Sequence, residues 1–218
     1  KDATQNLYRS GASEDASESD LSDPSFTVAA RYYVPESTVK EKTDSADYDR
    51  EWFIGFKDIT SATNARTMIA SVLPYTAVGN KLPLLLTNEE PRRVACLLAN
   101  LNSMAYDFAC RQKIGNVTLN WYIVRQTPVL PPEAYNRTIG DQQLLEWVSR
   151  RVAKLTYTAT DLDKWGTDLG YQDTPHQWDK NERRSLRVDL DAVYFHLYDL
   201  THSEAEHILD SFTTVRKR

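Results

Sequence analysis

After residue 25 the chain has short runs of aromatic and aliphatic residues separated by proline, glycine and asparagine. The runs cover residues 26–34, 52–59, 67–73 and 82–86, and their length and composition are typical of β-strands. Pro83 cannot donate a backbone hydrogen bond, so it predicts an edge strand or a strand start in the last run. Together the four runs predict one small sheet, mixed or antiparallel.

A longer pattern with a helical period follows Pro91. Apolar residues recur every three or four positions from Val94 to Phe108, and proline is well suited to the first helical turn. The pattern predicts one long helix that ends before Gly115. Residues 118–125 then alternate between polar and apolar and are predicted to form another strand.

The last third of the chain has helical periodicity and possible capping residues. Asp141, Asp179 and Ser203 are the predicted caps, and the last two have Glu three positions later, which is the spacing of a capping box. We expect a small bundle of helices near residues 141–156, 160–169, 180–198 and 203–211. The predicted fold class is therefore α+β, with a small mixed or antiparallel sheet and one long helix, followed by a C-terminal helical bundle.

This pattern divides the chain of 218 residues into three segments. Residues 1–25 are small, polar and acidic, so we expect an acidic loop or linker. Residues 26–135 are predicted to form an α+β domain, and residues 136–218 a helical extension. Because the chain begins with Lys1 rather than Met, we expect it to be a piece of a longer protein.

Composition narrows the class of protein. No apolar run approaches the roughly 20 residues that span a bilayer, and the N-terminus lacks the features of a secretory signal. The two cysteines, Cys96 and Cys110, are too few for a disulfide framework, so we expect reduced thiols and a cytoplasmic location. These features argue against a membrane protein and against a secreted one.

The distribution of charge says more than the net value of -5. Residues 1–50 carry a net charge of -5, residues 51–135 carry +2, and residues 136–218 carry -2. Proteins that hold duplex DNA alone have a clear basic face, because much of the affinity comes from phosphate contacts. We therefore expect only weak binding of nucleic acid by this chain on its own.

Motifs of common enzymes are missing from the sequence. There is no glycine-rich phosphate loop, zinc-protease motif or nucleophile elbow, so no catalytic residue and no metal ligand is predicted. His196, His202 and His207 are close in sequence, but their spacing does not place a pair on one helix face. Asp189 and Asp191 are expected to make surface ion pairs with arginines of the same helix rather than to form an acid/base pair.

One region combines residue types that bind DNA. Residues 111–122 hold two cations, several amides, a hydroxyl and two aromatic rings around one predicted turn. Cations contact phosphates or guanine, amides contact adenine, and aromatic rings stack or wedge. The alternative is that Arg111 and Lys113 only complement the helix dipole and that Trp121 belongs to the core. The polar loops 61–67 and 79–81 are expected to face the same side.

These residues also carry a resemblance to a known family. Segments 55–74, 78–83, 97–108 and 111–115 resemble the C-terminal part of large bacterial adenine-specific DNA methyltransferases, the enzymes of restriction-modification systems and their phage-defence relatives. The segment 120–132 is similar to the end of a target-recognition domain, including those of type I specificity subunits. Segments between 155 and 212 look like the helical tail that follows, so the resemblance extends over residues 26–218.

The resemblance implies a division of labour between domains. In that family an upstream domain binds S-adenosylmethionine and carries an Asn-Pro-Pro-Tyr-type motif that holds the flipped adenine. This chain lacks the motif, so the resemblance implies a DNA-recognition fragment without a cofactor of its own. Its partners would be double-stranded DNA and the upstream methyltransferase domain. From their chemistry alone, the candidate DNA-binding residues are Asn64, Arg66, Lys81, Arg111, Lys113, Asn116 and Asn120.

A second hypothesis belongs to a different class. The chain would be a protein-interaction or scaffold module that docks the methyltransferase to partner subunits through the helices of residues 141–211. That hypothesis predicts an exposed apolar stripe on those helices and no basic concave face. A free-standing enzyme has the least support, because no catalytic set of residues was found.

Overall fold

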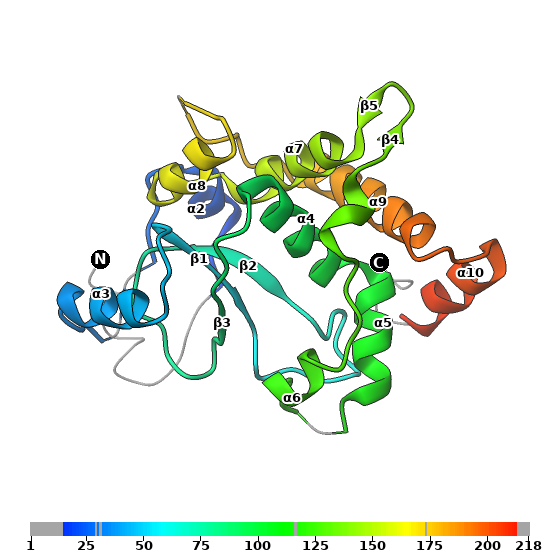
Figure 1. Ribbon diagram of the computed structural model, residues 1–218, viewed down its shortest axis with the longest axis horizontal. Helices are drawn as coiled ribbons and strands as arrows, with labels where there is room; N and C mark the ends of the chain where they lie inside the picture. Colours follow the sequence, from blue (N-terminus) through cyan, green and yellow to red (C-terminus); the bar gives the residue numbers. More distant parts are fainter. Residues whose placement is uncertain (1–14, 29, 31, 116, 173, 213–218) are drawn as a thin grey trace.

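The computed structural model describes residues 15–28, 30, 32–115, 117–172 and 174–212. Two helices, α2 (Glu18–Ser22) and α3 (Glu36–Ser45), precede a three-stranded antiparallel sheet of order β2-β1-β3 (Figure 1). The strands are β1 (Trp52–Phe56), β2 (Ala70–Pro74) and β3 (Leu84–Leu85). After the sheet come α4 (Pro91–Asn102), α5 (Met104–Lys113), α6 (Trp121–Val124) and the 3-10 turn η1 (Pro132–Tyr135). The remaining elements are β4 (Thr138–Ile139), β5 (Gln142–Gln143), α7 (Leu144–Thr156), η2 (Thr160–Leu162), α8 (Asp163–Asp168), α9 (Lys180–Leu197) and α10 (His202–Ser211).

The central strand β1 is buried along its whole length. Its alternate residues point to opposite faces of the sheet. On one face Trp52, Ile54 and Phe56 belong to the main core. On the other, the Phe53 ring stacks between those of Tyr48 and Tyr75, with centroids 5.5 and 5.3 Å away. Because both faces are covered, β1 is a rigid support for the loop that follows Phe56.

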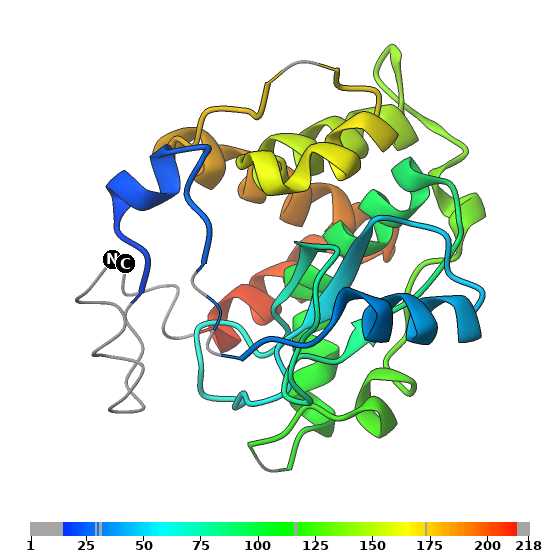
Figure 2. The ribbon, with the colours of Figure 1, turned by 90° about the vertical axis from the view of Figure 1, so that its left-hand side faces the viewer.

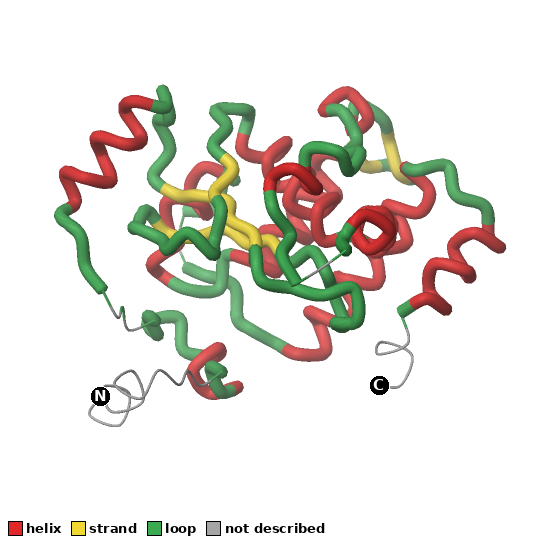
Figure 3. The backbone as a smooth tube through the Cα atoms, turned by 90° about the horizontal axis from the view of Figure 1, so that it is seen from below, coloured by secondary structure: helices red, strands yellow, loops and turns green. Residues whose placement is uncertain are grey.

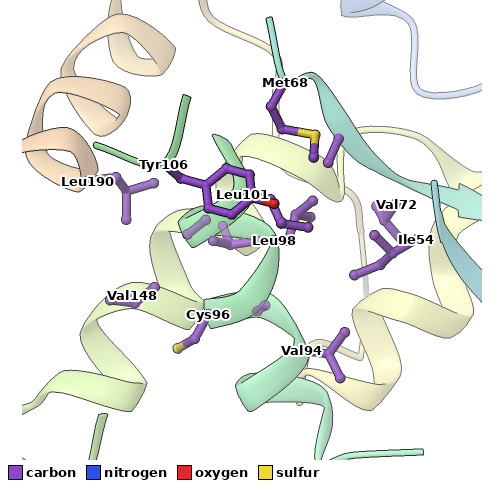
Figure 4. Packing of buried hydrophobic residues seen from close by; sticks show 14 of the residues in the cluster. Ile54, Met68, Val72, Val94, Cys96, Leu98, Leu101, Tyr106, Val148 and Leu190 are labelled. Atoms are coloured by element: carbon purple, nitrogen blue, oxygen red, sulfur yellow. The ribbon is translucent and has the colours of Figure 1, made fainter. Parts of the chain in front are cut away.

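Helix α4 lies at the centre of the main core. Figure 4 shows Leu98 and Leu101 of this helix between Ile54 and Val72 of the sheet on one side and Val148 of α7 on the other. Figure 2 shows the same layering, with α7 on the far side of α4 from the sheet. The main core therefore crosses the boundary predicted at residues 135 and 136.

The α+β class is confirmed, and so are most elements. Strands overlap the predicted runs 52–59, 67–73 and 82–86, with β2 ending one residue later than predicted, and Pro83 directly precedes the short edge strand β3. Helices occur within or close to all four predicted C-terminal ranges. Asp179 caps α9 as predicted, with its carboxylate accepting from the Glu182 backbone N–H at 2.6 Å.

The prediction of one long helix after Pro91 is wrong, because the backbone breaks at Ser103. This residue has an extended conformation, with φ -71° and ψ 151°, between α4 and α5. Its hydroxyl donates to the Asn100 carbonyl at 2.8 Å and accepts from the Tyr106 backbone N–H at 3.3 Å. The side chain of Asn102 bonds both backbone groups of Ala70, at 3.1 and 3.0 Å, and so continues the edge of β2. These polar contacts outweigh an apolar period that runs through both helices.

Replacing Ser103 with alanine is expected to lower the free energy of unfolding by about 1 kcal/mol, because it removes the cap of α5. The measurement is urea denaturation followed by circular dichroism. Ser45→Ala is the control, since that hydroxyl is exposed and bonds only the last turn of α3. Equal stability of the two variants would contradict a capping role for Ser103.

Two predicted strands are not strands. The described residues of the segment 26–34 form no strand, and Val28 and Tyr33 are 79% and 84% exposed. Residues 121–124 form the short helix α6 instead of a strand, because Asn120 caps them. Thr118 alone makes a β-bridge, to Ile59.

Three smaller predictions also need correction. Within the predicted linker 1–25, residues 18–22 form α2 with a complete capping box at Ser17, while residues 1–14 lie outside the described part. Asp141 does not cap α7, because it sits in the turn of the β4–β5 hairpin, where Gly140 has a positive φ of 54°. Helix α10 is capped by Thr201 with Glu204, two residues before the predicted Ser203 pair.

Candidate nucleic-acid interface

Three segments distant in sequence meet at one end of the molecule. The Leu119 N–H donates to the Asp58 carbonyl at 2.7 Å, and the Thr60 N–H donates to the Val117 carbonyl at 3.0 Å. The Asp58 N–H donates to the Lys81 carbonyl at 3.2 Å. We call the described residues of 57–67, 79–81 and 111–125 the basic end; Figure 3 shows the molecule from this side. Backbone hydrogen bonds therefore join the predicted loops 79–81 and 111–122 to residues 58–60, which directly precede the predicted loop 61–67.

The charges of this end are unbalanced. Residues 52–88 and 103–132 contain six basic and two acidic residues. The two acidic residues, Asp58 and Asp107, are both buried. The basic residues are Lys57, Arg66, Lys81, Arg111, Lys113 and Arg125. Lys57, Lys113 and Arg125 are exposed. The basic end therefore presents exposed cations, and neither of these two segments adds an exposed carboxylate.

Asp58 fixes Lys81 at this end. One carboxylate oxygen accepts from the Lys81 Nζ at 3.0 Å, while the side chain of Lys81 stays 59% exposed. The other oxygen, Oδ1, is buried and has no hydrogen-bond partner among the described residues. The ammonium group of Lys81 is thus held by Asp58, and the side chain remains accessible to solvent.

Arg111 has an internal role that the sequence did not predict. Its guanidinium donates to the backbone carbonyls of Ala62, Asn64 and Ala65, at 3.0, 2.6 and 3.1 Å. The side chain is 10% exposed and lies 3.5 Å from the carboxylate of Asp107. Burial lowers the pKa of Arg111, and the charge of Asp107 opposes that shift. Arg111 therefore sets the conformation of loop 61–67 from beneath it.

Arg66 also has internal partners, and it lies near the same Phe212 ring as Arg111. Its guanidinium donates to Asp191 of α9 at 2.9 Å and lies 5.7 Å from the centroid of the Phe212 ring. It lines a cavity of about 390 Å³ between β2 and α9, together with Arg183 and Arg187. Burial raises the pKa of Asp191, and the charge of Arg66 opposes that shift.

The predicted surface ion pairs of α9 are therefore wrong in their partners. Asp191 bonds Arg66 and the Met104 backbone N–H, the latter at 2.7 Å, instead of an arginine of its own helix. Asp189 accepts from Arg151 of α7 at 3.1 Å. Both carboxylates tie α9 to other elements.

The remaining candidates lie at the surface of the basic end. Lys113 is exposed and is the last residue of α5. Asn64 and Asn120 are exposed, and the Asn120 side chain accepts from the Ile123 N–H at 3.3 Å. Asn116 lies outside the described residues. The structure thus brings Asn64, Lys81, Lys113 and Asn120 to one end, and gives Arg66 and Arg111 internal partners.

Sequence reasoning missed two exposed cations of this end, and it included the two aromatic rings beside them. Lys57 follows β1, and Arg125 follows α6 with its guanidinium 5.9 Å from the centroid of the Trp121 ring. Trp121 is 37% exposed and packs edge-on against Phe56 at 5.2 Å, so it is both a core neighbour and a surface residue. Tyr122 is 71% exposed. The capping position of Asn120 before Trp121 was the signal that could have identified a helix presenting these side chains.

The described residues hold no group of three or more His, Cys, Asp or Glu side chains placed to bind a metal ion. Both cysteines are buried and free, and burial raises the pKa of their thiols, that of Cys110 to about 11. No helix in the described part of the chain combines the length and apolar character needed to cross a membrane.

No family model matches this chain, and neither a curated protein nor a solved structure shows significant similarity to it.

Proposed function

We propose that this chain is the DNA-recognition fragment of a bacterial adenine-specific DNA methyltransferase. The observation that supports it best is the basic end, which carries both exposed cations and exposed aromatic rings. Segments 52–88 and 103–132 contribute no exposed carboxylate to it. Cations supply phosphate affinity, while amides and rings supply contacts to bases.

The other parts of the proposal come from the sequence resemblance. The duplex would be held by this chain while an upstream domain binds S-adenosylmethionine and transfers the methyl group. The parent protein would work in the bacterial cytoplasm, where the DNA is. Only a few cations are exposed at the basic end, which agrees with a fragment that shares phosphate contacts with another domain.

The scaffold hypothesis has less support from the exposed apolar residues. On the described helices of residues 141–211, the large exposed apolar side chains are Val188 and Leu209, which lie on different helices. At the basic end, Ile59, Val117 and the two aromatic residues of α6 are exposed. An interface is therefore favoured at the basic end rather than on the C-terminal helices.

The proposal predicts weaker, less salt-dependent DNA binding when the exposed cations are removed. The variant Lys57→Ala, Lys113→Ala, Arg125→Ala should bind a duplex oligonucleotide less tightly than the unsubstituted chain. If each residue contacts one phosphate, the slope of log K against log salt concentration should fall by about 2.7. The binding constant is measured by fluorescence anisotropy at salt concentrations from about 20 to about 200 mM, a range over which DNA affinity depends steeply on salt.

A matched control removes three exposed lysines elsewhere. Lys40 and Lys42 lie on α3 and Lys164 on α8, and the first and last are 71% and 65% exposed. This control has the same change in net charge, and its salt slope should stay close to that of the unsubstituted chain. Equal losses in the two triple variants would mean that binding is not located at the basic end.

A further inference from the structure

The backbone of Tyr122 is held by its neighbours, and its side chain is exposed. Leu119 before it is fully buried, and Ile123 and Val124 after it are 7% and 8% exposed. Asn120 caps the short helix, and the neighbouring Trp121 packs against Phe56. The backbone of Tyr122 is thus fixed from both sides, so a partner that contacts its ring needs to order little more than one side chain.

The segments next to α6 carry exposed apolar and positively charged residues. Ile59 and Val117 are 44% and 62% exposed, and they are neighbours because Ile59 forms a bridge to Thr118. Arg125, which directly follows this helix, lies near the Trp121 ring. The nearby acidic residue, Asp58, is buried and paired with Lys81. An anionic partner with an apolar face complements these residues in polarity and charge.

A nucleobase next to its phosphate is such a partner. Aromatic side chains stack on base faces, and cations beside them contact the backbone. In an intact duplex the base faces are covered by neighbouring bases, and only base edges and phosphates are accessible. The face of a base becomes available where the duplex is opened, as it is when a base is flipped out.

We propose that Tyr122 stacks on an unstacked base, so that the basic end prefers a locally opened duplex to an intact one. The inference rests on the proposed function and adds to it the class of DNA that is bound. The exposed cations hold the phosphates on either side of the opening. The Tyr122 ring covers the base face that the opening exposes, and the phenolic hydroxyl is not needed for this contact.

The test compares two duplexes that share the same first strand. In one, the complementary strand pairs with every base, and in the other it leaves a single adenine unpaired. Binding to the whole chain is followed by fluorescence anisotropy at low salt. The unsubstituted chain should bind the duplex with the unpaired adenine about five-fold more tightly or better, the lower end of what one stacked base contributes. Tyr122→Ala should lose this preference and bind the paired duplex with little change, whereas Tyr122→Phe should keep the preference.

Tyr33→Ala is the matched control, because Tyr33 is an exposed tyrosine outside the basic end. It should behave as the unsubstituted chain does. Equal affinity of the unsubstituted chain for both duplexes, or a preference that survives in Tyr122→Ala, would overturn the stacking role while leaving DNA binding intact. No binding to either duplex, even at low salt, would overturn the proposed function as well.

Discussion

Replacing Asp107 with alanine is expected to lower the free energy of unfolding by about 3–5 kcal/mol, the usual effect of leaving a buried charge without its partner. The carboxylate is fully buried. It accepts from the backbone N–H groups of Thr67, at 2.9 and 3.1 Å, and of Met68, at 2.8 Å. Alanine would leave these two N–H groups without their acceptor, and the buried guanidinium of Arg111 without its counter-charge. Urea denaturation followed by circular dichroism measures the change.

The same substitution should also disturb the basic end. Arg111 shapes loop 61–67 through three carbonyls, and Asp107 holds both Arg111 and the residues that end this loop. Asp44→Ala is the control, because the ion pair of Asp44 with Lys40 is exposed and contributes about 0–1 kcal/mol. If Asp107→Ala were no less stable than Asp44→Ala, the buried network would not be what holds the loop.

Replacing Trp165 with alanine is expected to lower the free energy of unfolding by about 3–5 kcal/mol, the usual cost of truncating a buried tryptophan. Trp165 of α8 is fully buried, and its ring meets that of Trp52 in β1 at 4.6 Å. Its indole N–H donates to the Thr156 hydroxyl at 2.9 Å. The loss should weaken β1 as well as α8, so hydrogen exchange of the β1 amides should speed up.

Trp178→Ala is the control for this experiment. Trp178 is half-buried, and the guanidinium of Arg183 lies 5.8 Å from the centroid of its ring. We expect an effect of about 1 kcal/mol, which is typical of an exposed cation–π contact. Protection of the β1 amides that stays unchanged in Trp165→Ala would show that the sheet and the C-terminal helices unfold independently.

Sequence patterns predicted the elements whose signal lies within the element itself. The apolar period and the cap at Asp179 define α9, and the apolar run 52–56 is buried on both faces as a central strand. The segment 26–34 has the composition of a strand, but its described residues pair with no strand, and composition alone cannot supply a partner. Residues 118–125 fit two periods, and the cap at Asn120 decided between them.

The candidate site was predictable in its location and only partly in its residues. Three polar loops were expected to share a side, and backbone hydrogen bonds join residues 58–60, 81 and 117–119. The contacts of Arg66 with Asp191 and of Arg111 with Phe212 were not predictable, because each pair is more than 100 positions apart in the sequence. Sequence spacing reports neighbours along a helix or strand, whereas these contacts depend on how α5, α9 and α10 pack.

The position of Phe212 has a consequence for synthesis of the protein. Its ring lies 4.0 Å from the guanidinium of Arg111 and is 1% exposed, so it closes the network beneath loop 61–67. The ribosome makes Arg66 and Arg111 well before it makes Phe212, and contacts between such distant residues form slowly. In a growing chain the contacts beneath loop 61–67 therefore cannot be completed until Phe212, which follows α10, has left the ribosome. Nascent chains that stall earlier should be cleaved more readily by proteases at this loop.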